Sequence, residues 1–233
     1  MNPSPTDTSH EGATSPMPGL RRFEFAALAA LVVLLVLLAL LAPLALAEEP
    51  APDALIKSIT AELTAAIRQD PEIRAGNGRR LSELVEAKIV PHFDFDRAVQ
   101  IAMGPSWRSA TLEQQEELTR EFKTLVLRTY SGALAAYRDQ AIAFRPLRAR
   151  PGDSEVTVRS EIKQPGSEAL AIEYDMEKTG AGWKVYDIRV SGISLVATYR
   201  NTFSEEVRNH GIEGLIQQLS AKNRQAVSAR ARS

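Results

Sequence analysis

Cysteine is absent from all 233 residues of the chain. This absence excludes a lipid-modified cysteine as a membrane anchor, a disulfide bond, and a thiolate that acts as nucleophile or metal ligand. Histidine is also scarce, with three residues in the chain. The fold must therefore be stable on its apolar core alone.

The chain also has no excess of charge of one sign. It contains 28 basic and 29 acidic residues, so its formal net charge is −1 at pH 7. Binding to nucleic acid needs a basic surface that neutralises phosphates, which a neutral chain does not supply. The same balance gives no strong electrostatic attraction to an anionic membrane surface. We therefore expect no nucleic-acid partner.

One long hydrophobic run is present near the N-terminus. Arg21 and Arg22 precede an uncharged apolar segment at residues 25–46, which ends in the small-residue site Ala45-Leu46-Ala47. This order of basic, apolar and small residues is typical of a secretory signal peptide. We therefore predict a signal peptide over residues 1–47. The run is also long enough to span a bilayer, so a retained anchor is the alternative.

The remaining boundaries follow from composition. Residues 1–16 are polar and unusual for a signal peptide, so Met17 is a possible start of translation. Residues 48–222 are long enough for one domain. Residues 223–233 are mostly polar, and we predict a flexible tail there.

Helical periodicity dominates the first half of the exported part. Apolar residues at helical spacing predict helices over residues 53–68, 81–90 and 94–103. A longer helix begins at Thr111, where Thr-Leu-Glu-Gln fits a capping box. Its apolar face comprises Leu118, Phe122, Leu125, Val126, Tyr130, Leu134 and Tyr137.

After Gln140 the apolar period changes from that of a helix to that of a strand. Alternation predicts four strands, near residues 142–144, 156–162, 170–176 and 183–190, with a bulge at Tyr186 and Asp187. Two short helices, over residues 204–211 and 212–219, are expected to follow. The prediction is an α+β domain in which a curved four-stranded antiparallel sheet packs one face against the long helix. A cavity would lie in the gap between them.

Few side chains are suited to catalysis or metal binding. His92 and Asp96, if helical, would share a face at a spacing that binds a metal or pairs a base with an acid. The alternation of Phe93 and Phe95 instead favours a loop in which both rings pack inward and Asp94 caps the next helix.

Two further charged residues lie in apolar surroundings. Asp187 lies within an apolar strand, where a carboxylate must find hydrogen-bond partners. Those partners are either structural or belong to a ligand. Arg200 either binds a phosphate or pairs with an acidic residue.

Residues 183–216 carry four motifs in succession, namely W-x-V-Y-D, S-G-I-S-L-V, Y-R-x-x-F and G-I-x-x-L-I. In this order they resemble the MlaC family, the periplasmic phospholipid-binding proteins of Gram-negative bacteria that are also called toluene-tolerance auxiliary proteins. The resemblance extends over about residues 55–222.

The resemblance implies a fold and a function. The fold would be similar to that of nuclear transport factor, with extra helices, and acyl chains would lie between sheet and helices with the headgroup near the surface. Such a protein shuttles phospholipid through the periplasm, between an outer-membrane lipoprotein–porin complex and the substrate-binding ring of an inner-membrane ABC transporter. It maintains the lipid asymmetry of the outer membrane. It needs no cofactor and catalyses no reaction.

The resemblance also suggests which apolar residues form the wall of a lipid cavity. By composition alone these positions would be ordinary core. The expected wall consists of Phe122, Val126, Tyr130, Leu134, Val156, Val158, Ile172, Tyr174, Val185, Ile188, Ile193, Leu195 and Val196. Asp187 and Arg200 are the candidates for contact with the headgroup.

Two alternatives remain open at this point. One is an isomerase or dehydratase of similar fold, in which buried Asp187 or Asp96 acts as a base with a raised pKa. The other is an interaction module in the periplasm that keeps residues 25–46 as a membrane anchor.

Overall fold

The computed structural model describes residues 49–136, 140–163, 166 and 168–230. The chain divides into two units, Met1–Glu48 and Glu49–Ser233, and the first lies outside the described residues. The predicted signal peptide over residues 1–47 and the start at Met17 fall there and stay predictions. Among the helices that the structure describes, none combines the length and the hydropathy that crossing a membrane requires.

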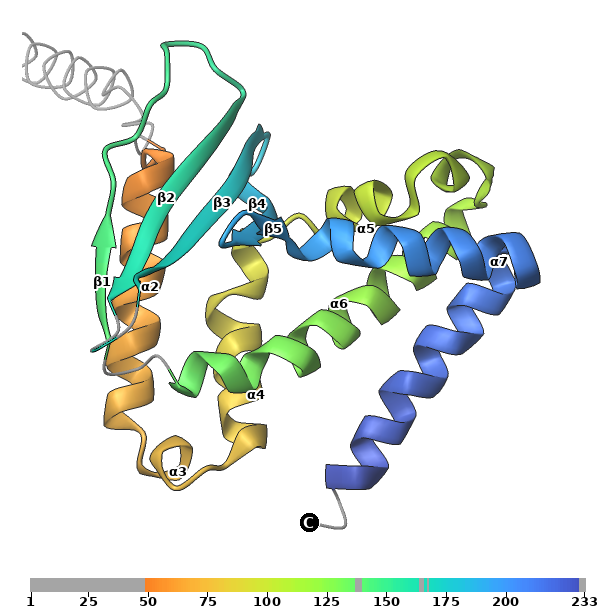
Figure 1. The fold of residues 1–233 in the computed structure, drawn as a ribbon, viewed down its shortest axis with the longest axis horizontal. Helices are drawn as coiled ribbons and strands as arrows, with labels where there is room; N and C mark the ends of the chain where they lie inside the picture. The colour runs from red at the N-terminus through yellow and green to blue at the C-terminus, as the bar shows by residue number, and fades with distance from the viewer. Residues whose placement is uncertain (1–48, 137–139, 164–165, 167, 231–233) are drawn as a thin grey trace, which may run out of the picture. The chain divides into compact units, whose positions relative to one another are not determined.

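The second unit is an α+β fold around a five-stranded antiparallel sheet, whose strands lie in sequence order (Figure 1). The strands are β1 (Ala141–Phe144), β2 (Glu155–Lys163), β3 (Leu170–Thr179), β4 (Gly182–Val190) and β5 (Ile193–Ser194). The predicted four-stranded sheet was one strand short, because β5 has two residues and so carries no alternation. The likeness to nuclear transport factor stays a prediction.

The predicted bulge in the last long strand is confirmed. Asp175 of β3 pairs with Asp187 of β4, whereas Met176 pairs with Val185, so Tyr186 is the extra residue. A bulge turns neighbouring side chains out of strict alternation. This allows β4 to present consecutive residues to the same space, which matters for the cavity described below.

The helices and short 3-10 turns surround this sheet. They are α2 (Pro52–Gln69), α3 (Pro71–Arg74), α4 (Gly78–Lys88), η1 (Val90–His92), α5 (Phe95–Met103), η2 (Gly104–Ser109), α6 (Leu112–Ala136) and α7 (Leu195–Arg230). The predicted capping box at the start of α6 is confirmed. The N–H of Gln114 donates to Thr111 Oγ1 at 3.2 Å, and the N–H of Thr111 donates to Gln114 Oε1 at 3.1 Å.

The C-terminal helix differs from the prediction at both ends. It begins at Leu195 rather than near residue 204, because the apolar residues after β5 form its first turn. It kinks at Gly211, which has φ 72 and ψ −180 (Figure 1). It then continues past Lys222 to Arg230, across the boundary of the predicted tail. Asn223 is buried there, and its amide donates to the carbonyl oxygen of Glu121 at 3.0 Å.

The inner face of the sheet packs mainly against α2. Val156 and Val158 of β2 form a buried cluster with Met176, Val185 and Ile56, the last from α2. The prediction that this face packs against the long helix is therefore wrong for the centre of the sheet. The buried residues of α2, among them Ile56, lie along one face of that helix, and this face packs on the sheet.

Helix α6 instead distributes its apolar residues among three neighbouring helices. Leu118 and Phe122 are buried in a cluster with residues of α5 and α7, such as Val99 and Leu215. Leu127 packs against a second cluster, formed by α2, α3 and α4. Its apolar residues lie on several sides of the helix because three helices surround it.

The kink of α7 depends on the backbone conformation of Gly211, and a substitution at this residue tests that dependence. The backbone conformation of Gly211 is open essentially to glycine alone. We predict that Gly211→Ala lowers the free energy of unfolding by about 1–3 kcal/mol, measured by urea denaturation. A Cβ at Gly211 meets no atom within 4 Å, so the cost arises from the backbone and not from a clash.

Gly132 provides the matched control. It lies in the regular helix α6, and a Cβ there also meets no atom within 4 Å. Gly132→Ala should raise the free energy of unfolding by about 0.5–1 kcal/mol. If both substitutions changed stability in the same direction, the account of the kink would be wrong.

Candidate functional site

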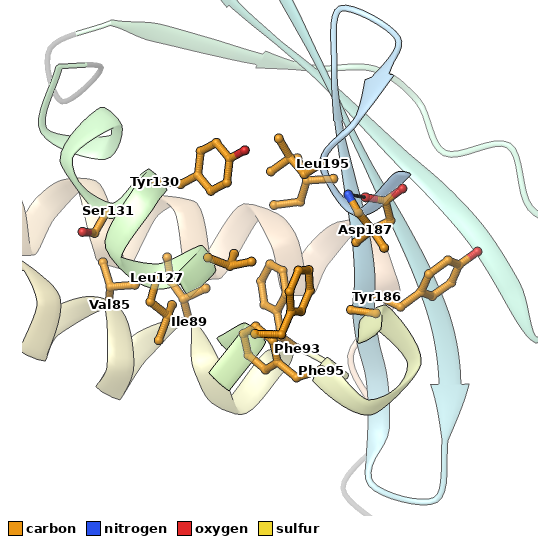
Figure 2. A pocket seen from close by; sticks show the side chains of 15 residues that line it. Val85, Ile89, Phe93, Phe95, Leu127, Tyr130, Ser131, Tyr186, Asp187 and Leu195 are labelled. Carbon is orange, nitrogen blue, oxygen red and sulfur yellow. Dashed lines mark hydrogen bonds between the residues drawn. The ribbon is translucent and has the colours of Figure 1, made fainter. Parts of the chain in front are cut away.

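A cavity of about 130 Å³ lies between the helices and β4 (Figure 2). Helix α6 and strand β4 line it from opposite sides, with Phe93 and Phe95 between them. The lining residues are Val85 of α4 and Ile89 directly after it, Phe93 after η1, Phe95 and Ala98 of α5, Phe122, Val126, Leu127, Tyr130 and Ser131 of α6, Tyr186, Asp187 and Ile188 of β4, and Leu195 and Val196 of α7.

Helical periodicity places two of these walls. Val85 and Ile89 are four residues apart, as are Val126 and Tyr130, so each pair projects from one side of its helix. The two helices pack against each other through Leu127, which belongs to the cluster of α4. The walls are therefore anchored in the helical core and continue it into the cavity.

The aromatic wall comes from the segment between η1 and α5. The rings of Phe93 and Phe95 stack with centroids 5.7 Å apart and planes 26° apart. Between them, the N–H of Asp94 donates to the carbonyl oxygen of Val185 at 2.9 Å, and Asp94 Oδ1 accepts from the N–H of Arg97 at 2.8 Å. The predicted loop with Asp94 as helix cap is confirmed.

The alternative use of this segment as a metal or acid–base site is not supported. His92 lies in η1, whereas Asp96 lies in α5 and accepts a hydrogen bond from the Thr119 hydroxyl at 2.8 Å. Burial and then the charge of Lys184 lower the pKa of His92. In the part of the chain that the structure describes, no group of three or more potential ligands could hold a metal ion.

Among the described residues of the cavity wall, Asp187 is the charged side chain, and its partners are structural. The hydroxyl of Ser194 donates to Oδ2, and the N–H of Val196 donates to Oδ1 at 3.2 Å. Ser194 Oγ in turn accepts from the N–H of Ala197 at 2.8 Å. Both side chains therefore cap the N-terminus of α7, where the helix dipole favours a negative charge.

This cap explains why Asp187 tolerates burial at 8% exposure. A buried carboxylate is costly unless its oxygens accept hydrogen bonds, and both oxygens do so. The carboxylate joins β4 to α7 and thereby holds Leu195 and Val196 against the cavity. Of the two interpretations, the geometry favours structural partners.

On the side of α7 an aromatic residue extends the apolar surroundings of the cavity. Tyr199 of α7 packs edge-on against Phe122, with ring centroids 5.1 Å apart. Burial, and next the hydroxyl of Tyr130, raise the pKa of Tyr199 to about 12. A neutral phenol in this position adds no charge to the site.

About half of the predicted wall lines the cavity. The residues that do are Phe122, Val126, Tyr130, Ile188, Leu195 and Val196. Helix α6 and the segment 188–196 thus meet as expected. Whether these residues touch lipid stays a prediction.

Another part of the predicted wall lies in the core beneath α2. Val156, Val158 and Val185 are buried there with Ile56, and Tyr174 packs against them. Ile172 is buried on the same sheet, at 8% exposure. These residues have the predicted parity and pack against α2 instead of lining the cavity. Whether they touch lipid stays a prediction.

The remaining predicted residues lie elsewhere. Ile193 is 63% exposed, because it follows the tight turn at Ser191 and Gly192, which both have positive φ. Arg200 is exposed, its guanidinium donates to the carbonyl oxygen of Ile101 at 3.1 Å, and it is not among the residues that line the cavity. Its contact with a headgroup stays a prediction. The side chain of Leu134 lies outside the described part of the chain.

Sequence reasoning missed several lining residues. They are Val85, Ile89, Phe93, Phe95, Ala98, Leu127, Ser131 and Tyr186. The spacing of Val85 and Ile89 on a predicted helix was a usable signal, and the inward packing of both phenylalanines was expected without a cavity. Tyr186 carried no such signal, because its orientation depends on the bulge.

The chain is similar to proteins of one family. The family model described as MlaC protein matches residues 57–221. The chain is 26% identical over 170 residues to the toluene tolerance protein ttg2D of Pseudomonas putida, which covers 72% of this chain and 79% of that protein. It is 25% identical over 180 residues to the intermembrane phospholipid transport system binding protein MlaC of Haemophilus influenzae, covering 76% of this chain and 80% of that protein.

A solved structure is similar over nearly its whole length. It is the phospholipid-binding protein from Ralstonia solanacearum in complex with a phospholipid. The identity is 43% and the TM-score is 0.71, with 76% of this chain and 99% of that chain covered.

The cap at the start of α7 generates a prediction. Because Asp187 and Ser194 share one hydrogen-bond network, Asp187→Ala and Ser194→Ala should not be additive. We expect each to lower the free energy of unfolding by about 1–3 kcal/mol, and the double variant to cost less than their sum by about 0.5–3 kcal/mol. A double-mutant cycle in urea measures this. Additive effects would show that the two side chains act independently.

Proposed function

Because the chain belongs to the MlaC family, we propose that it binds phospholipid in the periplasm and carries it between membranes. The observation that carries this proposal is the cavity itself. It is lined by apolar and aromatic side chains from four helices and β4, and the charged group among its described lining residues, Asp187, already has structural partners. Such a space suits acyl chains and offers little to a polar substrate.

The relatives support the same cargo. The similar structure from Ralstonia solanacearum holds a phospholipid, and 99% of that chain is covered by the match. The relative from Haemophilus influenzae bears the name of a binding protein of an intermembrane phospholipid transport system. We therefore propose phospholipid as cargo rather than as a substrate to be converted.

The size of the cavity has a consequence for loading. Its volume of about 130 Å³ is below the roughly 300–1,000 Å³ of sites that enclose drug-sized ligands. A lipid with two acyl chains therefore fits only when the walls move apart. The walls belong to separate elements that meet mainly through apolar contacts. When the walls move apart, apolar contacts with acyl chains would replace the apolar contacts between the walls.

This replacement suits a carrier energetically. Burial of a methylene group away from water is worth about 0.8 kcal/mol. In a bilayer the same methylene is already dry, so transfer between bilayer and cavity is nearly balanced. A carrier of this kind takes up lipid and also releases it, and contacts with membrane complexes decide the direction.

The finer parts of the proposal concern those complexes. We propose that the protein exchanges lipid with an outer-membrane lipoprotein–porin complex and with the substrate-binding ring of an inner-membrane ABC transporter, and so maintains the asymmetry of the outer membrane. Export by a signal peptide over residues 1–47 belongs to the same proposal.

The enzyme alternative finds less support in the geometry. Both oxygens of Asp187 accept hydrogen bonds from the cap of α7, so this carboxylate already has a structural role that accounts for its burial. Asp96 is exposed and bonds to Thr119, outside the apolar cavity.

A mass measurement of the exported protein separates the cleaved form from the membrane-anchored alternative.

Val126 provides the direct test of the cavity. We predict that Val126→Arg reduces the phospholipid that co-purifies with the exported protein from the periplasm by about tenfold or more, because a buried guanidinium is costly beside acyl chains. Native mass spectrometry followed by organic extraction measures the lipid per chain. Gly132→Arg is the matched control, since it adds the same charge at an exposed position of the same helix.

Val158→Arg separates cavity wall from core. Val158 is 1% exposed in the cluster beneath α2, so this change should lower the free energy of unfolding sharply instead of only emptying the cavity.

The proposal would be wrong if a folded Val126→Arg protein, verified by circular dichroism, kept the lipid content of the unmodified chain.

A further inference from the structure

A second hollow adjoins the lipid cavity on its outer side. It has a volume of about 600 Å³ and is bordered by residues 93–96, residues 116–123 of α6, and residues 179–184 at the turn between β3 and β4. We call it the outer groove. Phe93 and Phe95 line both the cavity and the outer groove, so their stacked rings form a shared wall.

The described interior of the cavity offers a phosphate no cationic partner. Asp187 is an anion and would repel a phosphate, and Ser131, Tyr130 and Tyr186 are neutral. No basic side chain lines the cavity within the described residues. Burying an unpaired phosphodiester would be very costly, so the phosphate of a bound lipid must remain outside the apolar space.

The outer groove supplies the missing positive charge. Lys123 makes no ion pair or hydrogen bond within the described part of the chain. Lys184 donates to the carbonyl oxygen of Pro91 at 2.5 Å and has no carboxylate partner there. Arg120, the third basic residue of the groove, is already paired with Glu117 at 3.0 Å.

The acidic residues of the groove are mostly engaged. Asp94 caps α5 through the N–H of Arg97, and Asp96 accepts from the Thr119 hydroxyl. Glu116 is exposed at the edge of the groove. These carboxylates keep their charge, so the groove holds three acidic and three basic side chains. Of the basic ones, Lys123 and Lys184 have no carboxylate partner within the described residues and are the two that can pair with an anion beside the aromatic wall.

Resting on the function proposed above, we propose that the outer groove binds the phosphate of the lipid headgroup through Lys123 and Lys184. The acyl chains occupy the cavity, and the glycerol region crosses at Phe93 and Phe95. This assignment replaces Arg200 and Asp187, which were expected to contact the headgroup. The same two lysines could also bind inorganic phosphate, because the group that they recognise is a phosphate anion in either case.

The experiment compares two lipids that differ only in the phosphate-containing headgroup. The full chain, stripped of lipid, is incubated with vesicles of dioleoyl phosphatidylglycerol that contain a minor fraction of dioleoylglycerol. Mass spectrometry gives the ratio of the two lipids bound per chain. For Lys123→Gln/Lys184→Gln we expect the ratio of phospholipid to dioleoylglycerol to fall about tenfold, the size that loss of partly exposed charge-assisted contacts predicts.

Two further variants serve as controls. Lys222→Gln removes an exposed lysine on α7, far along the sequence from the groove, and should leave the ratio unchanged. Lys123→Gln alone breaks no contact within the described residues, so it tests the site even if loss of the Lys184 bond to Pro91 disturbs the fold. It should lower the ratio by a smaller factor in the same direction.

The outcomes separate this inference from the function on which it rests. If the unmodified chain loads neither lipid, the carrier function is wrong. If it loads both lipids and the lysine variants keep the same ratio, the headgroup assignment is wrong while the carrier function stands. If inorganic phosphate alone abolishes the preference for the phospholipid at concentrations comparable to the lipid, the groove is a free-phosphate site and the assignment is overturned.

Discussion

The arrangement of this domain depends on one buried carboxylate and on the need to satisfy it. Asp187 lies at 8% exposure in an apolar wall, where an unpaired charge would be very costly. Its partners are Ser194 and the first turn of α7, so the same contact links the sheet to the longest helix. The bulge at Tyr186 is the second half of this arrangement, because it lets three consecutive residues of β4 face the cavity. Without the cap, the segment that carries Leu195 and Val196 would lose its anchor.

A carrier and an enzyme would use this space differently. An enzyme needs a charged or polar group that acts on its substrate, whereas the carboxylate of Asp187 holds β4 to α7. The cavity walls are apolar and come from separate elements, so acyl chains can replace the contacts between them at little cost. Charge is instead placed outside, in the outer groove, where Lys123 and Lys184 lie beside the aromatic wall. Apolar interior and charged exterior together match an amphipathic cargo.

Much of the fold could be predicted from periodicity and caps, but the placement of the elements could not. The capping box at Thr111, the cap at Asp94 and the bulge at Tyr186 were all visible as local patterns, and each is present. Parity along β2 correctly assigned Val156 and Val158 to the buried face of the sheet, yet it could not tell that α2 covers them. Strand β5 and the early start of α7 were missed, because two residues carry no alternation and an apolar helical turn resembles a strand. About half of the predicted wall lines the cavity, namely residues of α6 together with Ile188, Leu195 and Val196, and their contact with lipid stays a prediction. The contributions of Val85, Ile89, Phe93 and Phe95 depend on tertiary packing.

The central claim is that acyl chains lie between α4, α5, α6 and β4, and not beneath α2. The most direct measurement is photo-crosslinking with a phospholipid that carries a diazirine on one acyl chain, followed by mapping of the adducts by mass spectrometry. The account predicts adducts at lining residues such as Ile89, Val126 and Tyr130. Adducts concentrated at Ile56 and Val158, in the cluster beneath α2, would contradict it.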